Sequence, residues 1–334
     1  MKWQWKIGEF GGIGVYLHAT FFLLIGFVAL SHVLQGDLAS QTIAGIAFII
    51  ALFASVVLHE FGHALTAKRY GIKTRDITLY PIGGVARLER MPDKPIEEFW
   101  VTLAGPAVNV VIAAILFIWI TITNDIVSLE RLSVTTGPFF ERLMVTNISL
   151  VLFNMLPAFP MDGGRVLRAL LAMRMEYTRA TQIAATIGQG MALLFGFVGL
   201  FTNPFLVFIA LFVWIGAAQE ASMVQMKSAL GGIPVNRAML TDYRTLAPSD
   251  SLGRAVELIL TGSQQDFPVI ANGTVVGVLT RDKVIGALAQ QGRDARVDQV
   301  MATKVTSADY AEMLEGALMR MEEHQASMIC VTRA

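Results

Sequence analysis

The sequence has 334 residues, of which 54% are hydrophobic and only 16% are charged, and its formal net charge is zero. Because an ordinary soluble domain has roughly 25% charged residues, this composition favours a membrane protein. The neutral balance excludes a nucleic acid as the expected partner, and the single cysteine, Cys330, excludes an internal disulfide.

Long uncharged, apolar stretches recur along the first two thirds of the chain. A bilayer core needs about 20 residues of helix, so each stretch predicts a transmembrane span. The last stretch has 40 residues and is interrupted at Thr202, Asn203 and Pro204, which predicts two spans joined by a tight turn. Six spans are predicted, within residues 12–34, 38–59, 99–124, 143–161 and 180–219.

Positive charges gather on one side of these predicted spans. The opposite loops contain Asp37, Asp125, Glu130 and only one basic residue, Arg131. Because basic residues stay on the cytoplasmic side, both termini are predicted to be cytoplasmic. The basic residues assigned to that side are Lys2, Lys6, Lys68, Arg69, Lys73, Arg75, Arg87, Arg90, Lys94, Arg165, Arg168, Arg174, Arg179 and Lys227.

The motif HEFGH occupies residues 59–63, at the cytoplasmic end of the second predicted span. Positions i and i+4 share one face of a helix, so His59 and His63 can bind the same zinc ion. Glu60 then stands where it can take a proton from a zinc-bound water. The alternative is a pair of histidines bonded to neighbouring carbonyls, but ionisable residues are costly in a membrane and are usually functional there.

Two further motifs follow in chain order. The segment DITLYPIGGVARLER, residues 76–90, alternates apolar and polar residues and predicts a strand pair around Gly83 and Gly84. Its edge could pair with an extended substrate, although a plain amphipathic hairpin fits the same pattern. In AGPAVN, on the third predicted span, Gly105 and Asn109 are expected to serve helix packing.

The segment NMLPAFPMDGG follows the fourth predicted span. Pro157 and Pro160 break the helix, and irregular backbone at this depth must line a cavity or be buried in protein. An ordinary interfacial turn would explain Asp162 taken alone, whereas the nearby HEFGH motif favours Asp162 as a third metal ligand. Asn154 could donate to a developing oxyanion or bond to a neighbouring helix, and these alternatives are equally good.

The composition becomes more polar after Lys227. This change predicts a membrane domain at residues 1–228, a linker at 229–236 and a C-terminal domain at 237–334. Two β-rich runs around Asn272 and Gly273 predict a hairpin between helices. A second copy begins near Val305, offset by about sixty residues, and indicates a tandem repeat. This second copy is incomplete, since the sequence ends at Ala334 before a counterpart of TVVGVLTRDK.

HEFGH, AGPAVN and NMLPAFPMDGG, in this order, resemble the site-2 protease family of intramembrane zinc metalloproteases. The C-terminal repeat resembles a pair of CBS (cystathionine β-synthase) domains, and the combination is similar to the bacterial and archaeal branch that includes the sporulation pro-sigma-factor protease. The expected fold is a polytopic α-helical membrane protein with six transmembrane helices and a cytoplasmic α/β CBS-type repeat, in a prokaryotic plasma membrane.

The resemblance implies one zinc per chain, held by His59, His63 and Asp162, with Glu60 as the catalytic acid and base. It implies that Asn154, Gly83 and Gly84 position a membrane-spanning protein substrate. CBS pairs often bind ATP or another adenine nucleotide, which assigns Thr280 and Asp282 to that site, and they often form homodimers.

Two other functions fit the same framework. One is a CBS-regulated membrane metal transporter whose histidines line the metal pathway. The other is a catalytically inactive relative that binds client proteins. Glu60 argues against both, because neither needs a base beside two metal ligands.

Overall fold

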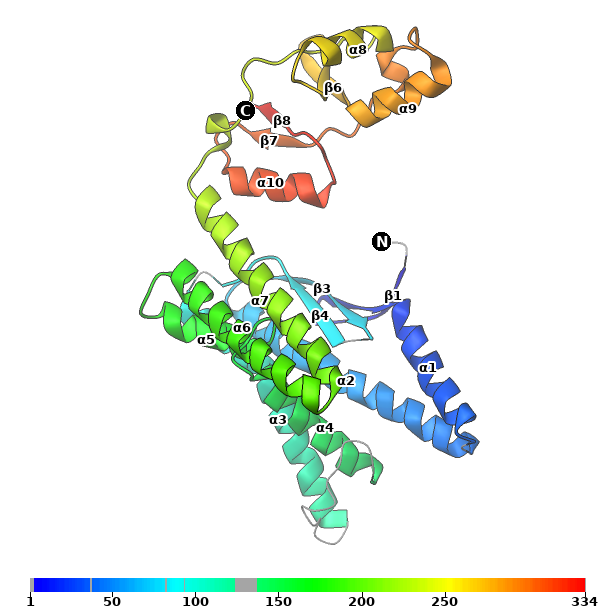
Figure 1. The fold of residues 1–334 in the computed structure, drawn as a ribbon, viewed down its shortest axis with the longest axis vertical. Helices are drawn as coiled ribbons and strands as arrows, with labels where there is room; N and C mark the ends of the chain where they lie inside the picture. The colour runs from blue at the N-terminus through cyan, green and yellow to red at the C-terminus, as the bar shows by residue number, and fades with distance from the viewer. Residues whose placement is uncertain (1–2, 37, 82, 93, 124–136, 334) are drawn as a thin grey trace. The chain divides into compact units, whose positions relative to one another are not determined.

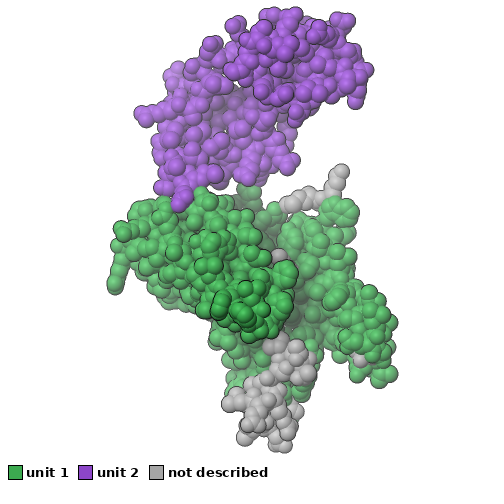
Figure 2. Space-filling model, in the orientation of Figure 1, with its two compact units in different colours: residues 1–224 green, residues 225–334 purple. Residues whose placement is uncertain are grey.

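The computed structural model of the protein describes residues 3–36, 38–81, 83–92, 94–123 and 137–333. The chain divides into two compact units, residues 1–224 and 225–334, which Figure 2 shows in different colours. The helix α7 (Pro204–Leu230) continues past this division in the sequence. The predicted linker, residues 229–236, therefore begins within the final turn of α7.

A four-stranded sheet with the strand order β1-β2-β3-β4 begins the first unit (Figure 1). The strands β1 (Gln4–Phe10) and β2 (Ile13–His18) form an antiparallel hairpin, whose turn residues Gly11 and Gly12 have φ of 62° and 85°. Glycine enters that region without steric cost. The strand β3 (Thr74–Tyr80) pairs in parallel with β2 and antiparallel with β4 (Gly83–Leu88), which confirms the predicted strand pair.

The first predicted span, residues 12–34, is wrong in its first half. Residues 13–18 form β2, and the helix α1 covers only Thr20–Leu34. The absence of charge suggested one long span, but β2 has an inward face with the buried Ile13 and Val15. Burial does not alternate along β2, but its apolar residues Ile13, Val15 and Leu17 stand at every second position, which indicates a strand rather than a helix.

Three helices frame the centre of the first unit: α2 (Ala39–Arg69), α3 (Pro95–Thr123) and α4 (Phe139–Asn154). Glycine lets α2 and α3 approach closely, since a Cβ at Gly62 would lie 2.6 Å from the carbonyl oxygen of Ala104. The sheet lies against α2, where Ile13 and Ile77 pack on Ala64. The motif HEFGH is thereby covered by the sheet as well as by α3.

A sharp turn follows α4 and leads into the short helix α5 (Asp162–Ala172). The fourth predicted span extends to residue 161, but α4 ends at Asn154, consistent with the helix-breaking Pro157 and Pro160. The helix α6 (Tyr177–Phe201) comes next, and Glu176 caps it by accepting from the backbone N–H groups of Thr178 and Arg179. The predicted break at residues 202–204 separates α6 from α7.

Among the described residues, four helices are long and apolar enough to cross a membrane, namely α2, α3, α6 and α7. The other two predicted spans correspond to α1 and α4, which have 15 and 16 residues. A straight crossing needs about 20 residues of helix. The first unit is a multi-pass membrane domain with four such helices, and the count of six spans stays a prediction.

The second unit contains α8 (Leu252–Thr261), the hairpin of β5 (Phe267–Ala271) and β6 (Thr274–Leu279), and α9 (Arg281–Gln291). The predicted turn at Asn272 and Gly273 is confirmed, with φ of 51° and 77°. Such left-handed pairs are favoured in two-residue hairpins because they match the twist of the strands. Leu246, Leu252, Phe267 and Leu279 form the core of this half.

The remaining elements are β7 (Ser307–Asp309), α10 (Leu314–Glu323) and β8 (Cys330–Thr332). Their arrangement repeats the first half: Leu246 bridges in parallel to Val269 of β5, as Ala308 of β7 pairs in parallel with Val331 of β8. Short 3-10 turns at Val235–Arg237 and Val297–Gln299 precede the two halves at the same spacing. The sequence repeat is therefore also a repeat of structure.

Candidate metal centre

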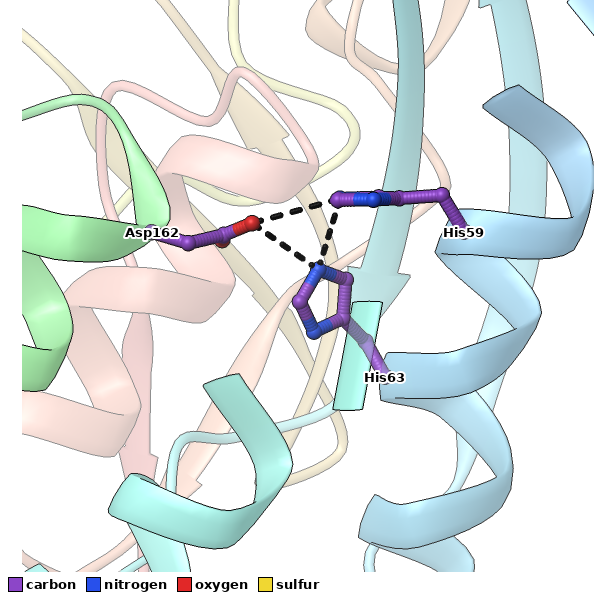
Figure 3. A group of neighbouring side chains, drawn as sticks. All are labelled: His59, His63 and Asp162. Atoms are coloured by element: carbon purple, nitrogen blue, oxygen red, sulfur yellow. Dashed lines mark hydrogen bonds and ion pairs between the residues drawn. The ribbon is translucent and has the colours of Figure 1, made fainter. Parts of the chain in front are cut away.

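His59 and His63 lie one helical turn apart on α2, and their rings point toward the first residue of α5, Asp162 (Figure 3). The Nε2 atoms of the two histidines are 3.1 Å apart. Asp162 Oδ2 lies 3.2 Å from Nε2 of His59 and 3.3 Å from Nε2 of His63. The three side chains are largely shielded from solvent, so the structure joins the three predicted ligands at one point.

The triangle formed by these atoms has the size that zinc requires. Tetrahedral zinc with bonds of about 2.0–2.1 Å separates its ligand atoms by about 3.3 Å. Nδ1 of His63 lies 2.8 Å from the carbonyl oxygen of Val101. A carbonyl only accepts, so Nδ1 carries the proton and Nε2 of the neutral ring offers its lone pair. A carboxylate oxygen facing this lone pair would repel it, a metal ion between them removes the repulsion, and two nitrogens with one oxygen suit zinc.

Glycines make room for this convergence. A Cβ at Gly105 of α3 would lie 2.2 Å from Nε2 of His63 and 2.7 Å from Nε2 of His59. A Cβ at Gly163 would lie 2.2 Å from the carbonyl oxygen of Leu156, and one at Gly164 would lie 2.6 Å from the backbone of Ala158. The two glycines after Asp162 therefore let the start of α5 pack directly on the preceding turn, which brings the Asp162 carboxylate to the histidines.

Glu60 follows His59 on α2 and contacts the edge strand of the sheet. Its Oε2 accepts a hydrogen bond of 3.2 Å from the backbone N–H of Ala86 on β4. A Cβ at Gly84 would lie 2.9 Å from Cγ of Glu60 and 3.1 Å from Val56. The small residue thus allows β4 to lie against Glu60, and the backbone of β4 orients the Glu60 carboxylate.

The other residues predicted to contact a substrate lie at the ends of their elements. Gly83 begins β4, with φ of 142°, and Gly84 follows it. Asn154 is the last residue of α4 and is half-buried. Within the described part of the chain, its side-chain amide makes no hydrogen bond to another side chain or backbone group. Of the two alternatives for Asn154, the interhelical hydrogen bond is therefore not supported by the described residues.

Sequence reasoning missed the role of Asn109. The expectation of helix packing for Gly105 and Asn109 is incomplete, because both contact the metal-binding histidines. Asn109 is fully buried, and its Oδ1 lies 2.6 Å from Nδ1 of His59. It is joined through Asn147 of α4 to Ser55 of α2. Three polar residues in three apolar runs were the available signal, since such residues seek one another inside a membrane domain.

Thr280 and Asp282, the residues predicted to bind a nucleotide, lie at the N-terminus of α9 in the second unit. Both line a cleft of about 560 Å³. Thr280 is the N-cap residue, and its side chain does not cap the helix. The cleft also contains the basic residues Lys283, Lys304 and His324 and the acidic Asp266, whose Oδ1 accepts from the backbone N–H of Arg281 at 2.9 Å.

Comparisons with known proteins identify the family to which this chain is similar. The chain matches the model of Peptidase family M50 over residues 47–133 and 120–195, and that of the CBS domain over residues 231–290. A zinc metalloprotease of Methanocaldococcus jannaschii is 34% identical over 281 residues, covering 84% of this chain and 78% of that protein. Stage IV sporulation protein FB of Bacillus subtilis is 29% identical over 157 residues, covering 47% of this chain and 51% of that protein. The solved site-2 protease from Methanocaldococcus jannaschii is 33% identical, with a TM-score of 0.49, covering 73% of this chain and 99% of that structure.

Proposed function

Because the chain belongs to peptidase family M50 and is an intramembrane zinc metalloprotease of the site-2 type, we propose how the residues around its metal centre hydrolyse a peptide bond. Zinc is the cofactor, at the site formed by His59, His63 and Asp162. Bound zinc polarises a carbonyl oxygen and lowers the pKa of a water at its open position to about 7. The remaining chemistry belongs to the side chains and backbone of this chain.

Glu60 acts as the general base and then as the general acid. It takes a proton from the attacking water while the water oxygen bonds to the scissile carbonyl carbon. It then delivers that proton to the leaving nitrogen, so the C–N bond breaks and a carboxyl group and an amine are released. The observation that carries this proposal is the hydrogen bond from Ala86 N–H to the Glu60 carboxylate, which fixes the base beside the three metal ligands.

The substrate is a membrane-spanning protein that presents an extended segment to the edge of β4. A helical peptide bond is shielded by its own helix, so cleavage needs an unwound segment. The edge strand β4 offers backbone groups for strand addition, and the amide of Ala86 already points at Glu60. Gly83, at the start of the strand, leaves space for a peptide to come close, since an added Cβ there would have no neighbour within 4 Å, and Gly84 lets β4 lie against Glu60.

Asn154 stabilises the oxyanion that forms at the scissile carbonyl. It lies at the end of α4, where the turn toward Asp162 begins. A primary amide placed near developing negative charge donates a hydrogen bond that strengthens as the charge grows. Its amide is not occupied by another described residue, which is what such a role requires.

The membrane domain crosses the bilayer six times, with both termini in the cytoplasm. The shorter helices α1 and α4 supply the fifth and sixth spans, and the distribution of lysine and arginine sets the direction. The active site then lies near the cytoplasmic end of α2.

An adenine nucleotide binds the second unit, in the cleft that Thr280 and Asp282 line, and regulates proteolysis. Lys283 and Lys304 supply positive charge for a phosphate group, which would share the N-terminal turn of α9 with the Asp266 carboxylate. Asp282 can accept from ribose hydroxyl groups.

The role of Glu60 can be tested with Glu60→Gln in the full chain, reconstituted in liposomes. The substrate is a single-span membrane protein selected by co-expression screening and tagged at both ends. Glutamine has nearly the same size but cannot accept the proton, so cleavage should fall by about 10²–10⁴-fold. Zinc per chain, measured by elemental analysis, should stay at the wild-type value because Glu60 is not a ligand.

The matched control is Glu89→Gln, which removes an exposed carboxylate just after β4 and should leave both values unchanged. Cleavage by Glu60→Gln at a rate near wild type would refute the general-base role. Loss of zinc in that variant would make Glu60 a ligand or a structural support instead.

A further inference from the structure

A chain of buried amides connects His59 to the two neighbouring helices. Asn109 Oδ1 on α3 lies 2.6 Å from Nδ1 of His59, and Asn109 Nδ2 donates to Asn147 Oδ1 on α4 at 2.9 Å. Asn147 Nδ2 donates to the carbonyl oxygen of Leu143 at 2.8 Å and to Oγ of Ser55 at 3.3 Å. Asn109 and Asn147 are both fully buried, so no bulk water competes for these groups.

The direction of every hydrogen bond in this chain follows from its far end. The carbonyl oxygen of Leu143 can only accept, so Asn147 must turn its NH₂ group toward it. The oxygen of Asn147 then faces Asn109, so Asn109 must donate to it from its own NH₂ group. The oxygen of Asn109 is left facing His59, and Nδ1 of His59 must carry the proton.

We propose that Asn109, oriented by Asn147, is a positioning residue that holds His59 in the tautomer whose Nε2 lone pair faces the metal. A partner on the second ring nitrogen of a metal-bound histidine typically fixes its tautomer and its ring orientation. The inference relies on zinc at His59, His63 and Asp162, and it does not depend on the roles proposed for Glu60, β4 or Asn154.

The two histidines differ in how they are held. Nδ1 of His63 donates to the backbone carbonyl oxygen of Val101. A substitution at position 101 that keeps the fold also keeps this carbonyl group. His59 depends on a side chain, and that side chain depends on a second one. Mutation should therefore weaken the hold on His59 in two graded steps, at Asn109 and at Asn147.

The test measures zinc affinity rather than proteolysis. Purified full-length protein in detergent competes with a chromophoric chelator for Zn²⁺ alone. Asn109→Leu, which has a similar size but no acceptor, should weaken zinc binding by about 10–100-fold. Asn147→Leu keeps Asn109 but releases its orientation, so it should cause a smaller loss.

Two variants separate positioning from packing. Asn109→Asp has the same shape and keeps an oxygen that accepts from His59 Nδ1–H, although it loses the N–H that donates to Asn147, so its zinc affinity should lie between those of Asn109→Leu and the wild type. Thr146→Val changes a buried hydroxyl beside Asn147 that donates within α4 to the carbonyl oxygen of Arg142, and this variant should bind zinc as the wild type does.

The proposal is overturned if Asn109→Leu, eluting as a single species in gel filtration, binds zinc with wild-type affinity. It is also overturned if Asn109→Asp is as weak as Asn109→Leu, or if Thr146→Val loses as much affinity as Asn147→Leu. If Asn109→Leu fails to fold, the zinc affinities of Asn109→Asp and Asn147→Leu are compared with that of the wild type instead. Wild-type affinity in Asn147→Leu would then overturn the proposal. None of these results depends on Glu60, so failure here is distinguishable from failure of the proposed catalytic role.

Discussion

Gly105 controls the space at the metal centre from the helix that faces the histidines. An added Cβ would meet Nε2 of both His59 and His63 well within van der Waals distance. The position lies in the closely packed contact of α2 with α3, so the backbone has little freedom to withdraw. At the scale of single residues, the site therefore has no room for a side chain at position 105 while the two histidines keep their present positions.

Gly105→Ala should therefore lower zinc retention sharply and abolish cleavage. The methyl group occupies the place toward which the two imidazoles point, so the rings must turn away from Asp162. Zinc per chain by elemental analysis is the measurement. Gly190→Ala is the matched control, because its Cβ in α6 would have no neighbour within 4 Å and should leave zinc unchanged. Full zinc content in Gly105→Ala would show that the site can accommodate the extra carbon.

Single-residue features could be predicted where the information is local. His59 and His63 share a helical face by their spacing alone. Asp162 could be proposed because the motif NMLPAFPMDGG follows in the expected order. The contacts of Gly105 and Asn109 with the histidines depend on how α3 packs on α2, and spacing within one segment does not contain that information.

At the scale of elements, α5 is joined to its neighbours by a buried network of charges. Arg168 of α5 is 1% exposed and Glu98 of α3 is 0% exposed, and Arg168 Nε donates to Glu98 Oε1 at 2.8 Å. The same guanidinium pairs with Glu220 of α7 and lies over the rings of Phe159 and Tyr177. Because α5 begins with Asp162, this network also ties the third metal ligand to α3.

Arg168→Met should destabilise the membrane domain, because it leaves Glu98 buried without its partner. Breaking a buried ion pair in this way typically costs about 3–5 kcal/mol. A lower midpoint in thermal unfolding of the detergent-solubilised protein is the expected result. The control Arg174→Met removes an exposed arginine just after α5 and should leave the midpoint nearly unchanged. An equal midpoint for Arg168→Met and the wild type would mean that the network contributes nothing.

Sequence reasoning placed Arg168 among the cytoplasmic loop charges that set the orientation of the spans. That assignment stays a prediction, but it did not include the burial of Arg168, because a charged side chain is almost never fully buried unless it is paired. Its partners Glu98 and Glu220 are 70 and 52 residues away in the sequence, so the residues next to Arg168 do not indicate the pairing. The hairpin of β1 and β2 was missed for a related reason: absence of charge was given more weight than alternation.

At the scale of the whole molecule, the six-span arrangement makes a prediction about which surfaces face the cytoplasm. Single cysteines at Glu89 and Arg174 should react with a membrane-impermeant thiol reagent from the cytoplasmic side. Cysteines at Gln35 and Thr202 should react from the opposite side. All four positions are exposed. Labelling of both pairs from one side would contradict the arrangement.

The natural cysteine must be replaced first in this experiment. Cys330 is buried, and burial raises the pKa of its thiol, so less of the reactive thiolate is present at neutral pH. Cys330→Ser should therefore remove only a weak background signal. Asp125, Glu130 and Arg131, which are predicted to lie in a loop on the opposite side from the cytoplasm, are not among the described residues.

The second unit should bind an adenine nucleotide in the cleft lined by Thr280 and Asp282. Isothermal titration of the full chain with AMP, ADP and ATP separately measures this, and at least one of them should release or absorb heat with saturation. Asp282→Ala should weaken that binding, whereas Glu257→Ala, an exposed change on α8 away from the cleft, should not. No saturable binding at millimolar concentration would remove nucleotide regulation from the account.

Composition distinguishes the apolar first two thirds of the chain from its more polar C-terminal region, which is why two parts could be proposed from the sequence. The family, the protease activity and the zinc cofactor were also predicted from the ordered motifs, and the comparisons confirm them. The number of spans could not be fixed from apolar length, since α1 and α4 are shorter than a straight crossing requires.

The central claim is that one zinc ion is held by two imidazoles and the Asp162 carboxylate, and X-ray absorption at the zinc K edge of the purified full chain tests it most directly. We expect nitrogen and oxygen neighbours at about 2.0–2.2 Å, two of them from imidazole rings, and no sulfur neighbour at about 2.3 Å. Asp162→Ala should lose most of its zinc or show a changed set of light neighbours. A sulfur neighbour, or a spectrum and zinc content in Asp162→Ala identical to those of the wild type, would contradict the account.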